Sequence, residues 1–139
     1  MSTDRNQVLS LHKYFLNASQ MKRHYEDRGR AHGLASSPAD DDWTFQWIYL
    51  SLWYASLFVV AEGWQEARMR NERVSELLAD SEKLGALRRF RNGIFHFQAD
   101  YFDARIVDFL ALGAESALWA HELHAALGSD LLSRLRSAH

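Results

Sequence analysis

The feature that most constrains the fold is an uncharged, aromatic-rich stretch from Trp43 to Ala61. A segment of this length without a charge either crosses a bilayer or is buried inside the protein. Polar residues such as Gln46 and Ser51 interrupt it, three aspartates precede it at positions 40–42, and Glu62 follows it. No Lys or Arg lies close enough to set an orientation in a membrane. We therefore expect a helix buried on several sides, and no membrane span.

Helix breakers are scarce in the rest of the chain, which has one proline and seven glycines in 139 residues. Long helices suit this composition, whereas a β-sandwich needs many turns. Hydrophobic residues make up 47% and charged residues 24%, close to globular averages, which argues against disorder and against a coiled coil. We predict one helical domain over residues 1–139, an all-α antiparallel bundle of four to five helices.

The net charge and the cysteine count exclude some classes of site and of partner. The chain has no cysteine, which excludes disulfides and thiolate metal sites. Its net charge of −2 argues against a surface that is basic throughout, so any contact with nucleic acid must be local. The first six residues are polar and no apolar signal core follows them, so we expect a cytoplasmic protein.

Apolar residues at three- and four-residue spacings divide the chain into successive helices. Ser, Thr and Asp before these segments can cap them, and glycines 29 and 128 are expected to end two of them. The expected helices cover residues 2–28, 38–68, 74–80, 81–97 and 103–127, with a last short helix after Ser129. The loop is expected over residues 29–37, with Ser37 capping the second helix and Pro38 in its first turn.

Two of these helices have a clear expected buried stripe. In the first helix the stripe is Val8, Leu11, Phe15, Ala18, Met21 and Tyr25. In the fifth helix it is Ile106, Phe109, Leu110, Ala114, Ala117, Leu118, His121 and Ala125. The second helix carries more aromatic side chains than one stripe can hold, so it is either central in a bundle or also a contact face for a second copy.

A basic run from Arg88 to Gln98 has three arginines, an asparagine and a histidine among four apolar side chains. No acidic residue lies between Glu82 and Asp100. Leu84, Leu87, Phe90 and Ile94 recur at helical spacing, which places the run on the fourth helix with its arginines off the apolar side. Such a run either leaves its charges in water or holds them toward an anion.

Other candidate sites are weaker. His121 and His124 have a spacing that can chelate a metal, but no Glu-x-x-His pair of the kind found in helical-bundle metal sites occurs. Glu62 and Glu66 fit an exposed pair better than a catalytic pair, although Glu62 closes the uncharged stretch. Ser51 is expected to bond to its own backbone. No metal or other cofactor is expected.

Arg91, Asn92 and His96 have the side chains needed to cleave a phosphodiester without a metal ion. Histidine can remove or deliver a proton near neutral pH, a guanidinium can hold two phosphate oxygens, and an amide can orient a ribose hydroxyl. Five residues on an ideal helix advance the direction by about 140°. Arg91 and His96 therefore converge only if the helix loosens at Gly93 or if a second chain supplies half of the site.

The segment from Arg91 to His96, on a late helix of a compact all-α chain, resembles the Arg-x4-6-His motif of HEPN domains, the higher-eukaryote and prokaryote nucleotide-binding superfamily. The resemblance implies a four- or five-helix bundle, a homodimer with two motifs across one cleft, and metal-independent RNA cleavage in toxin–antitoxin or other defence systems. Arg91 would stabilise the transition state, His96 would act as general acid or base, and Asn92 would position the substrate. Arg88 and Arg89 are expected to bind RNA phosphates.

The sequence departs from one pattern of the superfamily, and other functions stay open. HEPN toxins often have a tyrosine two residues after the histidine, where this chain has Gln98, so regulation by modification of that tyrosine is not expected. The arginines could instead pair with acids such as Glu82, Asp100 or Asp103, around a core histidine. The chain would then be a non-catalytic module that binds an antitoxin or other protein partner, or a small-molecule sensor lined by Trp and Tyr.

Overall fold

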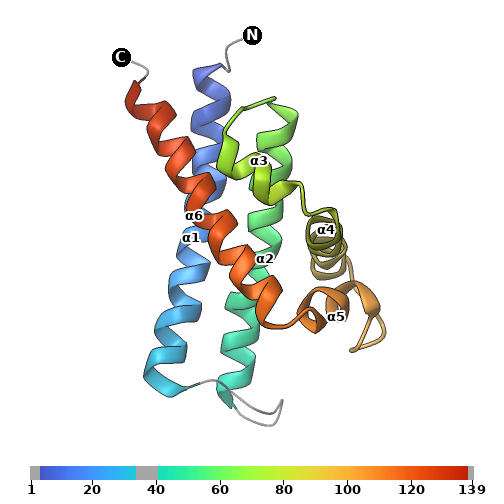
Figure 1. Cartoon of the computed structure of the whole chain (residues 1–139). Helices are drawn as coiled ribbons and strands as arrows, with labels where there is room; N and C mark the ends of the chain where they lie inside the picture. The colour runs from blue at the N-terminus through green and yellow to red at the C-terminus, as the bar shows by residue number, and fades with distance from the viewer. Residues whose placement is uncertain (1–3, 34–40, 138–139) are drawn as a thin grey trace.

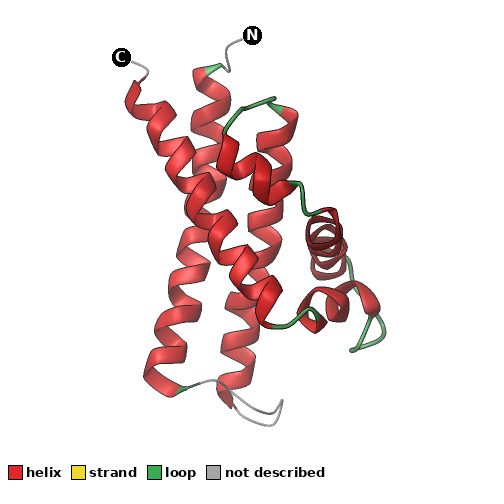
Figure 2. Ribbon diagram, in the orientation of Figure 1, coloured by secondary structure: helices red, strands yellow, loops and turns green. Residues whose placement is uncertain are grey.

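The computed structural model of the chain describes residues 4–33 and 41–137, which form six α-helices and no strand (Figures 1 and 2). This confirms the prediction of an all-helical protein. The helices are α1 (Arg5–His32), α2 (Asp41–Glu66), α3 (Glu72–Leu78), α4 (Ser81–Phe95), α5 (Ala104–Ala111) and α6 (Ala114–Ser137).

α1 and α2 form a long antiparallel hairpin, and α6 crosses it diagonally (Figure 1). α2 contacts α1, α4 and α6, while α4 and α5 pack on each other beside it. One end of the α1–α2 hairpin extends beyond the other helices, as Figure 1 shows. α2 is therefore the central helix over its C-terminal half, and its N-terminal half is covered mainly by α1.

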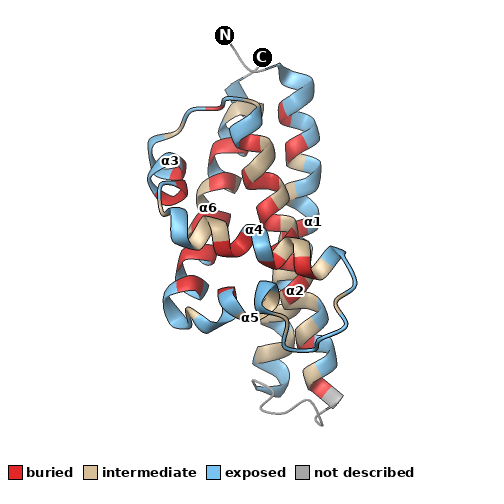
Figure 3. Ribbon diagram, turned by 90° about the vertical axis from the view of Figure 1, so that its right-hand side faces the viewer, coloured by how far each residue is buried: buried red, intermediate tan, exposed pale blue. Residues whose placement is uncertain are grey.

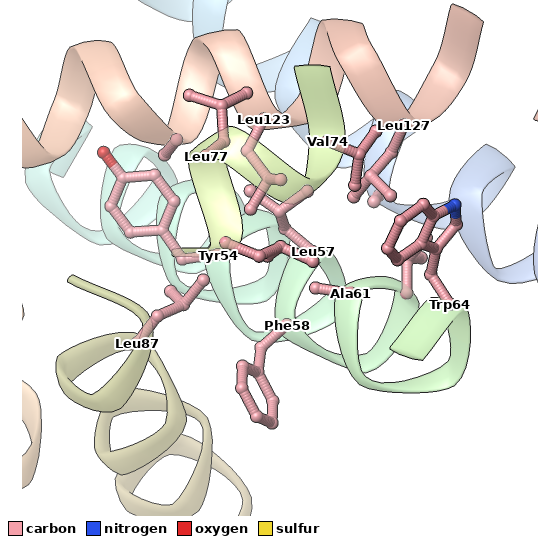
Figure 4. Close-up of a cluster of buried hydrophobic side chains, with 14 of the residues drawn as sticks. Tyr54, Leu57, Phe58, Ala61, Trp64, Val74, Leu77, Leu87, Leu123 and Leu127 are labelled. Atoms are coloured by element: carbon pink, nitrogen blue, oxygen red, sulfur yellow. The ribbon is translucent and has the colours of Figure 1, made fainter. Parts of the chain in front are cut away.

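The core lies where α2, α3, α4 and α6 meet, and Figure 3 shows the buried residues gathered along the inside of the bundle. Apolar side chains from all four helices interdigitate there, which removes their surfaces from water and provides the main driving force for folding. The residues labelled in Figure 4 are Tyr54, Leu57, Phe58, Ala61, Trp64, Val74, Leu77, Leu87, Leu123 and Leu127.

The predicted burial of the uncharged stretch is only partly realised. Residues 42–66 are long and apolar enough to cross a membrane by length and composition, and half of the most apolar window is buried in the bundle. Trp53, Tyr54 and Phe58 are buried, whereas Phe45 and Ile48 nearer the start of α2 are exposed. The N-terminal half of α2 thus keeps some exposed apolar surface, although the Arg28 guanidinium of α1 lies over the Phe45 ring, 4.4 Å from its centroid.

The first helix is shifted relative to its expected bounds. Asp4 caps α1 by accepting a hydrogen bond from the Asn6 backbone N–H at 3.1 Å. The predicted end at Gly29 is wrong, because α1 continues to His32 and is capped by Gly33 at φ 73°. A glycine inside a helix costs only about 1 kcal/mol, which the packing of α1 can offset. Positions 2, 3, 37 and 38 lie outside the described residues.

The prediction of one helix over residues 103–127 is also wrong. Asp103 does cap α5, but that helix ends at Ala111, and Gly113 at φ 70° separates it from α6. α6 then runs through Gly128, where a glycine is needed for packing rather than for a turn. A Cβ at this position would lie 2.5 Å from Phe15 Cζ of α1.

This break changes which residues of α6 are buried. The predicted stripe in this region is wrong, because Ala117, Leu118, His121 and Ala125 are all exposed. A new helix starts after Gly113 with its own rotational phase, so the pattern carried over from α5 does not apply. The buried residues of α6 are Ser116, Trp119, Ala120, Leu123, His124, Leu127, Asp130 and Leu131.

Candidate functional site

The basic run lies on α4, as its apolar spacing predicted. Asp80, rather than Ser81, caps this helix by accepting a hydrogen bond from the Lys83 backbone N–H at 3.2 Å. Leu87 and Phe90 are fully buried, and the ring of Phe90 contacts Tyr54 of α2 edge-on at 5.8 Å between centroids. This packing fixes the rotation of α4, so the arginines of the run lie beside the buried stripe and not within it.

Arg91 is held by three neighbours. Its Nε donates a hydrogen bond to Asn92 Oδ1 at 2.9 Å, and its Nη1 lies 3.5 Å from Glu62 Oε1 of α2. The guanidinium also lies over the ring of Phe58, 4.7 Å from its centroid. Arg88 approaches the same ring at 5.8 Å. Both guanidiniums therefore pack on the buried Phe58 ring, and Glu62 contacts the Arg91 guanidinium.

Arg89 is directed elsewhere. Its Nε lies 3.9 Å from Asp108 Oδ2 on α5, and both side chains are about half exposed. Arg88 and Arg91 are three residues apart and share one side of α4, as helical geometry requires. The structure therefore groups Arg88 with Arg91 and separates both from Arg89. The acids that contact Arg89 and Arg91 are Asp108 and Glu62, not the three that the sequence suggested.

His96 is the residue at which α4 ends. Its backbone is extended, and its N–H donates to the Asn92 carbonyl at 3.1 Å. The helix does not loosen at Gly93, which was one of the two conditions for convergence, because α4 continues to Phe95. Gly93 instead allows α5 to approach, since a Cβ there would lie 2.9 Å from Ile106 Cγ1.

The His96 side chain is exposed to solvent, so it is not the core histidine of the alternative interpretation. Across residues 4–33 and 41–137, no hydrogen bond or ion pair involves its imidazole, and no contact joins it to Arg91. The chain thus holds Arg91 and Asn92 together and leaves His96 available at the helix end. One copy alone does not bring the imidazole onto the guanidinium.

The second histidine candidate, His124, has a different setting. Trp53 Nε1 donates to His124 Nδ1 at 3.0 Å, and His124 Nε2 lies 3.0 Å from Ser19 Oγ. An indole can only donate, so Nδ1 carries no proton and Nε2–H donates to the serine. Burial lowers the pKa of His124 to about 4, with the positive charge of Lys22 acting in the same direction. His124 is therefore neutral at physiological pH.

The structure offers no metal site in this region. Within the described ranges, no three His, Asp or Glu side chains come together as metal ligands. Both ring nitrogens of His124 are used by Trp53 and Ser19, and His121, one helical turn earlier on α6, is exposed. Ser51 donates to the Ile48 carbonyl at 3.2 Å, which confirms the backbone bond expected for it.

Sequence reasoning missed Phe58 as the ring under the guanidiniums and did not link Glu62 to Arg91. The only sequence signal for Glu62 was its position as the first charge after the uncharged stretch. No family model matches the chain, and no curated protein and no solved structure matches it significantly. Arguments about function therefore rest on the residues of the chain itself.

Proposed function

We propose that this protein is a HEPN-like, metal-independent endoribonuclease that acts as a homodimer, of the kind found among toxin and defence proteins. The observation that carries the proposal is the end of α4. There Arg91 is positioned over Phe58 beside Asn92, and an exposed His96 follows within the same segment. A fixed guanidinium and an accessible imidazole are the two groups that phosphodiester cleavage without metal requires.

The reaction would use the ribose of the RNA as its nucleophile. The 2′-hydroxyl attacks the adjacent phosphorus, the P–O5′ bond breaks, and the products are a 2′,3′-cyclic phosphate and a 5′-hydroxyl. His96 takes the proton of the 2′-hydroxyl or delivers one to the leaving O5′. Arg91 stabilises the extra negative charge on the phosphoryl oxygens, and Asn92 orients the ribose.

Glu62 has a defined part in this proposal. It partly neutralises Arg91 while no RNA is bound, and its contact of 3.5 Å is long for an ion pair. A phosphate can therefore replace it on the guanidinium at small cost. Arg88, over the same Phe58 ring, would hold a neighbouring phosphate, while Arg89 would have to leave Asp108 to do so.

The dimer completes the site in this proposal. Within one copy Arg91 bonds to Asn92 and Glu62, and His96 lies beyond the helix end, so a second copy would bring its own motif across the cleft. The exposed Phe45 and Ile48 on α2 provide apolar surface for association. An antitoxin or another protein partner would bind the same assembly to control its activity.

A non-catalytic interaction module is the second candidate. Arg91 already has partners on its own chain in Asn92, Glu62 and Phe58, which a purely structural arginine would also have. The exposed apolar surface of α2 would then bind a partner. A small-molecule sensor has less support, because Trp53, Tyr54 and Trp64 are packed in the core.

Incubation of the purified protein with mixed RNA in EDTA tests the proposal. We expect the wild type to cleave, and His96→Ala to be slower by about 10²- to 10⁴-fold, as for loss of a general acid or base. Arg91→Ala should lose activity as well, whereas the exposed His121→Ala serves as a matched histidine control and should not. Intact RNA with folded wild-type protein would favour the interaction module.

Sedimentation of the same preparation tests the homodimer. We expect a dimer at micromolar concentration, weakened when Phe45 and Ile48 are both changed to serine. If the protein sediments only as a monomer at micromolar concentrations, the homodimer is removed from the proposal.

A further inference from the structure

Residues 96–103 form the loop between α4 and α5 (Figure 2). The aromatic side chains of this loop are exposed to solvent. Phe97 is 93% exposed, Phe102 72%, Tyr101 63%, and Phe95 at the end of α4 51%. Burying such a side chain would stabilise the protein or a complex by about 1.5–3 kcal/mol, but the rings of this short segment remain exposed in the single chain. Tyr101 and Phe102 contact each other edge-on, with ring centroids 4.9 Å apart. Exposed apolar side chains close together on a protein surface often mark a binding site.

The loop is held in place by its own polar contacts. Gln98 Nε2 donates to the His96 carbonyl at 2.9 Å, and Gln98 Oε1 accepts from Arg105 Nη1 at 2.9 Å. The Asp100 carboxylate accepts from the Phe102 backbone N–H at 3.0 Å. These bonds span the loop from its first residue to the start of α5. The rings are therefore presented on a defined turn.

The surroundings of the rings favour a nucleic acid over a bilayer. Lipid-binding loops usually combine aromatic residues with Lys or Arg, but residues 96–103 contain neither and include Asp100 and Asp103. The nearest cations in the chain lie on the two adjoining helices: Arg105 on α5, which binds Gln98, and the arginines of α4. Arg88 is exposed and, in the described part of the chain, has no ion pair. A nucleic acid whose phosphates bind the arginines of α4 and whose bases contact the rings of the loop would match this arrangement.

We infer that Phe97, Tyr101 and Phe102 form a platform on which bases of single-stranded RNA stack beside His96. The inference rests on the proposed function and names its substrate class. Base faces are free only in a single strand, and aromatic rings beside arginines are the usual means of binding them. A duplex keeps its bases stacked on each other and cannot use the rings. The site should therefore select unpaired RNA.

Binding measured in the His96→Ala background separates this inference from cleavage. Fluorescence anisotropy with a labelled single-stranded RNA oligonucleotide and with its duplex gives both affinities. We expect Phe97→Ala and Phe102→Ala each to weaken single-strand binding about fivefold or more, with little change for the duplex. Both rings are outside the core, so circular dichroism should show unchanged helix content.

Two matched variants define the type of contact. Phe97→Leu keeps an apolar side chain but removes the π face, and it should weaken binding as much as Phe97→Ala. Tyr14→Ala removes an exposed ring from α1 and should leave binding unchanged. Tight binding retained by the leucine variant would indicate a general apolar contact and overturn the inference.

The outcomes also distinguish the inference from the proposed function. Cleavage by the wild type with ring-independent binding would overturn the stacking platform and leave the nuclease in place. Ring-dependent binding of single strands without any cleavage would support the platform and remove the nuclease. Sedimentation with phosphatidylcholine–phosphatidylserine vesicles that depends on Phe97 and Phe102, with no such dependence for RNA, would assign the rings to a membrane and overturn the inference.

Discussion

His124 and His96 lie in regions that treat the same side chain in opposite ways. His124 is buried between α1, α2 and α6, with Trp53 on one ring nitrogen and Ser19 on the other. His96 lies at the exposed end of α4, and only its backbone is hydrogen-bonded. The first imidazole is fixed in one neutral tautomer by the bundle. The second is exposed to solvent at the helix end.

The difference shows that the position of a histidine, and not its presence, decides what it can do. Trp53 and Ser19 use both nitrogens of His124, which is buried in the bundle. Among the described residues, no side chain of α4 hydrogen-bonds to the His96 imidazole, which follows Arg91 and Asn92 at the end of the helix. The bundle thus fixes one histidine and leaves the other exposed, and the proposed function assigns the chemistry to the exposed one. The two positions should respond differently to the same mutations.

Replacement of His124 should have the largest effect on stability. His124→Ala leaves the buried Trp53 Nε1–H without an acceptor and opens a cavity beside Phe15, whose ring centroid is 4.7 Å from that of His124. We expect the free energy of unfolding to fall by about 2–4 kcal/mol. Urea unfolding followed by circular dichroism measures this change.

His96→Ala is the control for that measurement. Its side chain is exposed and makes no hydrogen bond within the described residues, so the unfolding free energy should stay within about 0.5 kcal/mol of the wild type. Equal losses of stability in the two variants would contradict the distinction between the two regions.

Acid should expose the same difference. Burial lowers the pKa of folded His124 to about 4, below the value of about 6.5 for an unfolded chain. The unfolded state then binds more protons, so the stabilising contribution is complete above about pH 6.5 and is lost as pH falls toward 4. Between pH 7.5 and pH 4.5 this group should cost about 2.5 kcal/mol of unfolding free energy.

The variant His124→Gln isolates this contribution from that of the carboxyl groups. Glutamine does not titrate, so the variant should lose less unfolding free energy than the wild type over the same pH interval. His96→Gln should follow the wild-type curve. A pH dependence identical in wild type and His124→Gln would show that His124 does not carry this effect.

Gly128 tests the packing that surrounds His124. A Cβ at this position would lie 2.5 Å from Phe15 Cζ, and the ring also contacts His124. Gly128→Ala should therefore destabilise the protein by about 1–3 kcal/mol, as for overpacking of a core. Thermal unfolding provides the measurement, and a stabilised variant would mean that Phe15 does not pack there.

The smallest effect is expected at Gly29, a helical glycine away from both histidines. Nothing lies within 4 Å of a Cβ added there. Gly29→Ala should raise the unfolding free energy by about 0.4–1 kcal/mol, because alanine loses less backbone entropy on folding. The contrast with Gly128→Ala separates helix propensity from packing, since both glycines lie inside helices. A loss of stability at Gly29 would contradict this assignment.

Local sequence patterns were sufficient for part of this fold. Leu84, Leu87, Phe90 and Ile94 predicted the rotation of α4, because they recur at helical spacing along one side of it. The same pattern placed the arginines off the apolar side. The basic run was therefore located correctly, and its place on the fourth helix is confirmed.

Long-range contacts were not accessible from the sequence. Leu112-Gly113 and Leu127-Gly128 look alike locally, yet one breaks the helix and the other continues it because Phe15 packs on Gly128. Trp53 and His124 are 71 residues apart, and Glu62 and Arg91 are 29 apart. Pairings of this kind follow from how the helices pack.

The most direct test of the account is the RNA cleavage rate of His96→Gln and His124→Gln, measured in EDTA and expressed per folded molecule. We predict that His96→Gln loses at least about 100-fold in rate, as for removal of a general acid or base. His124→Gln should cleave as fast as the wild type once its unfolded fraction is subtracted. Cleavage retained by folded His96→Gln, or lost equally in both variants, would contradict the assignment of chemistry to the end of α4.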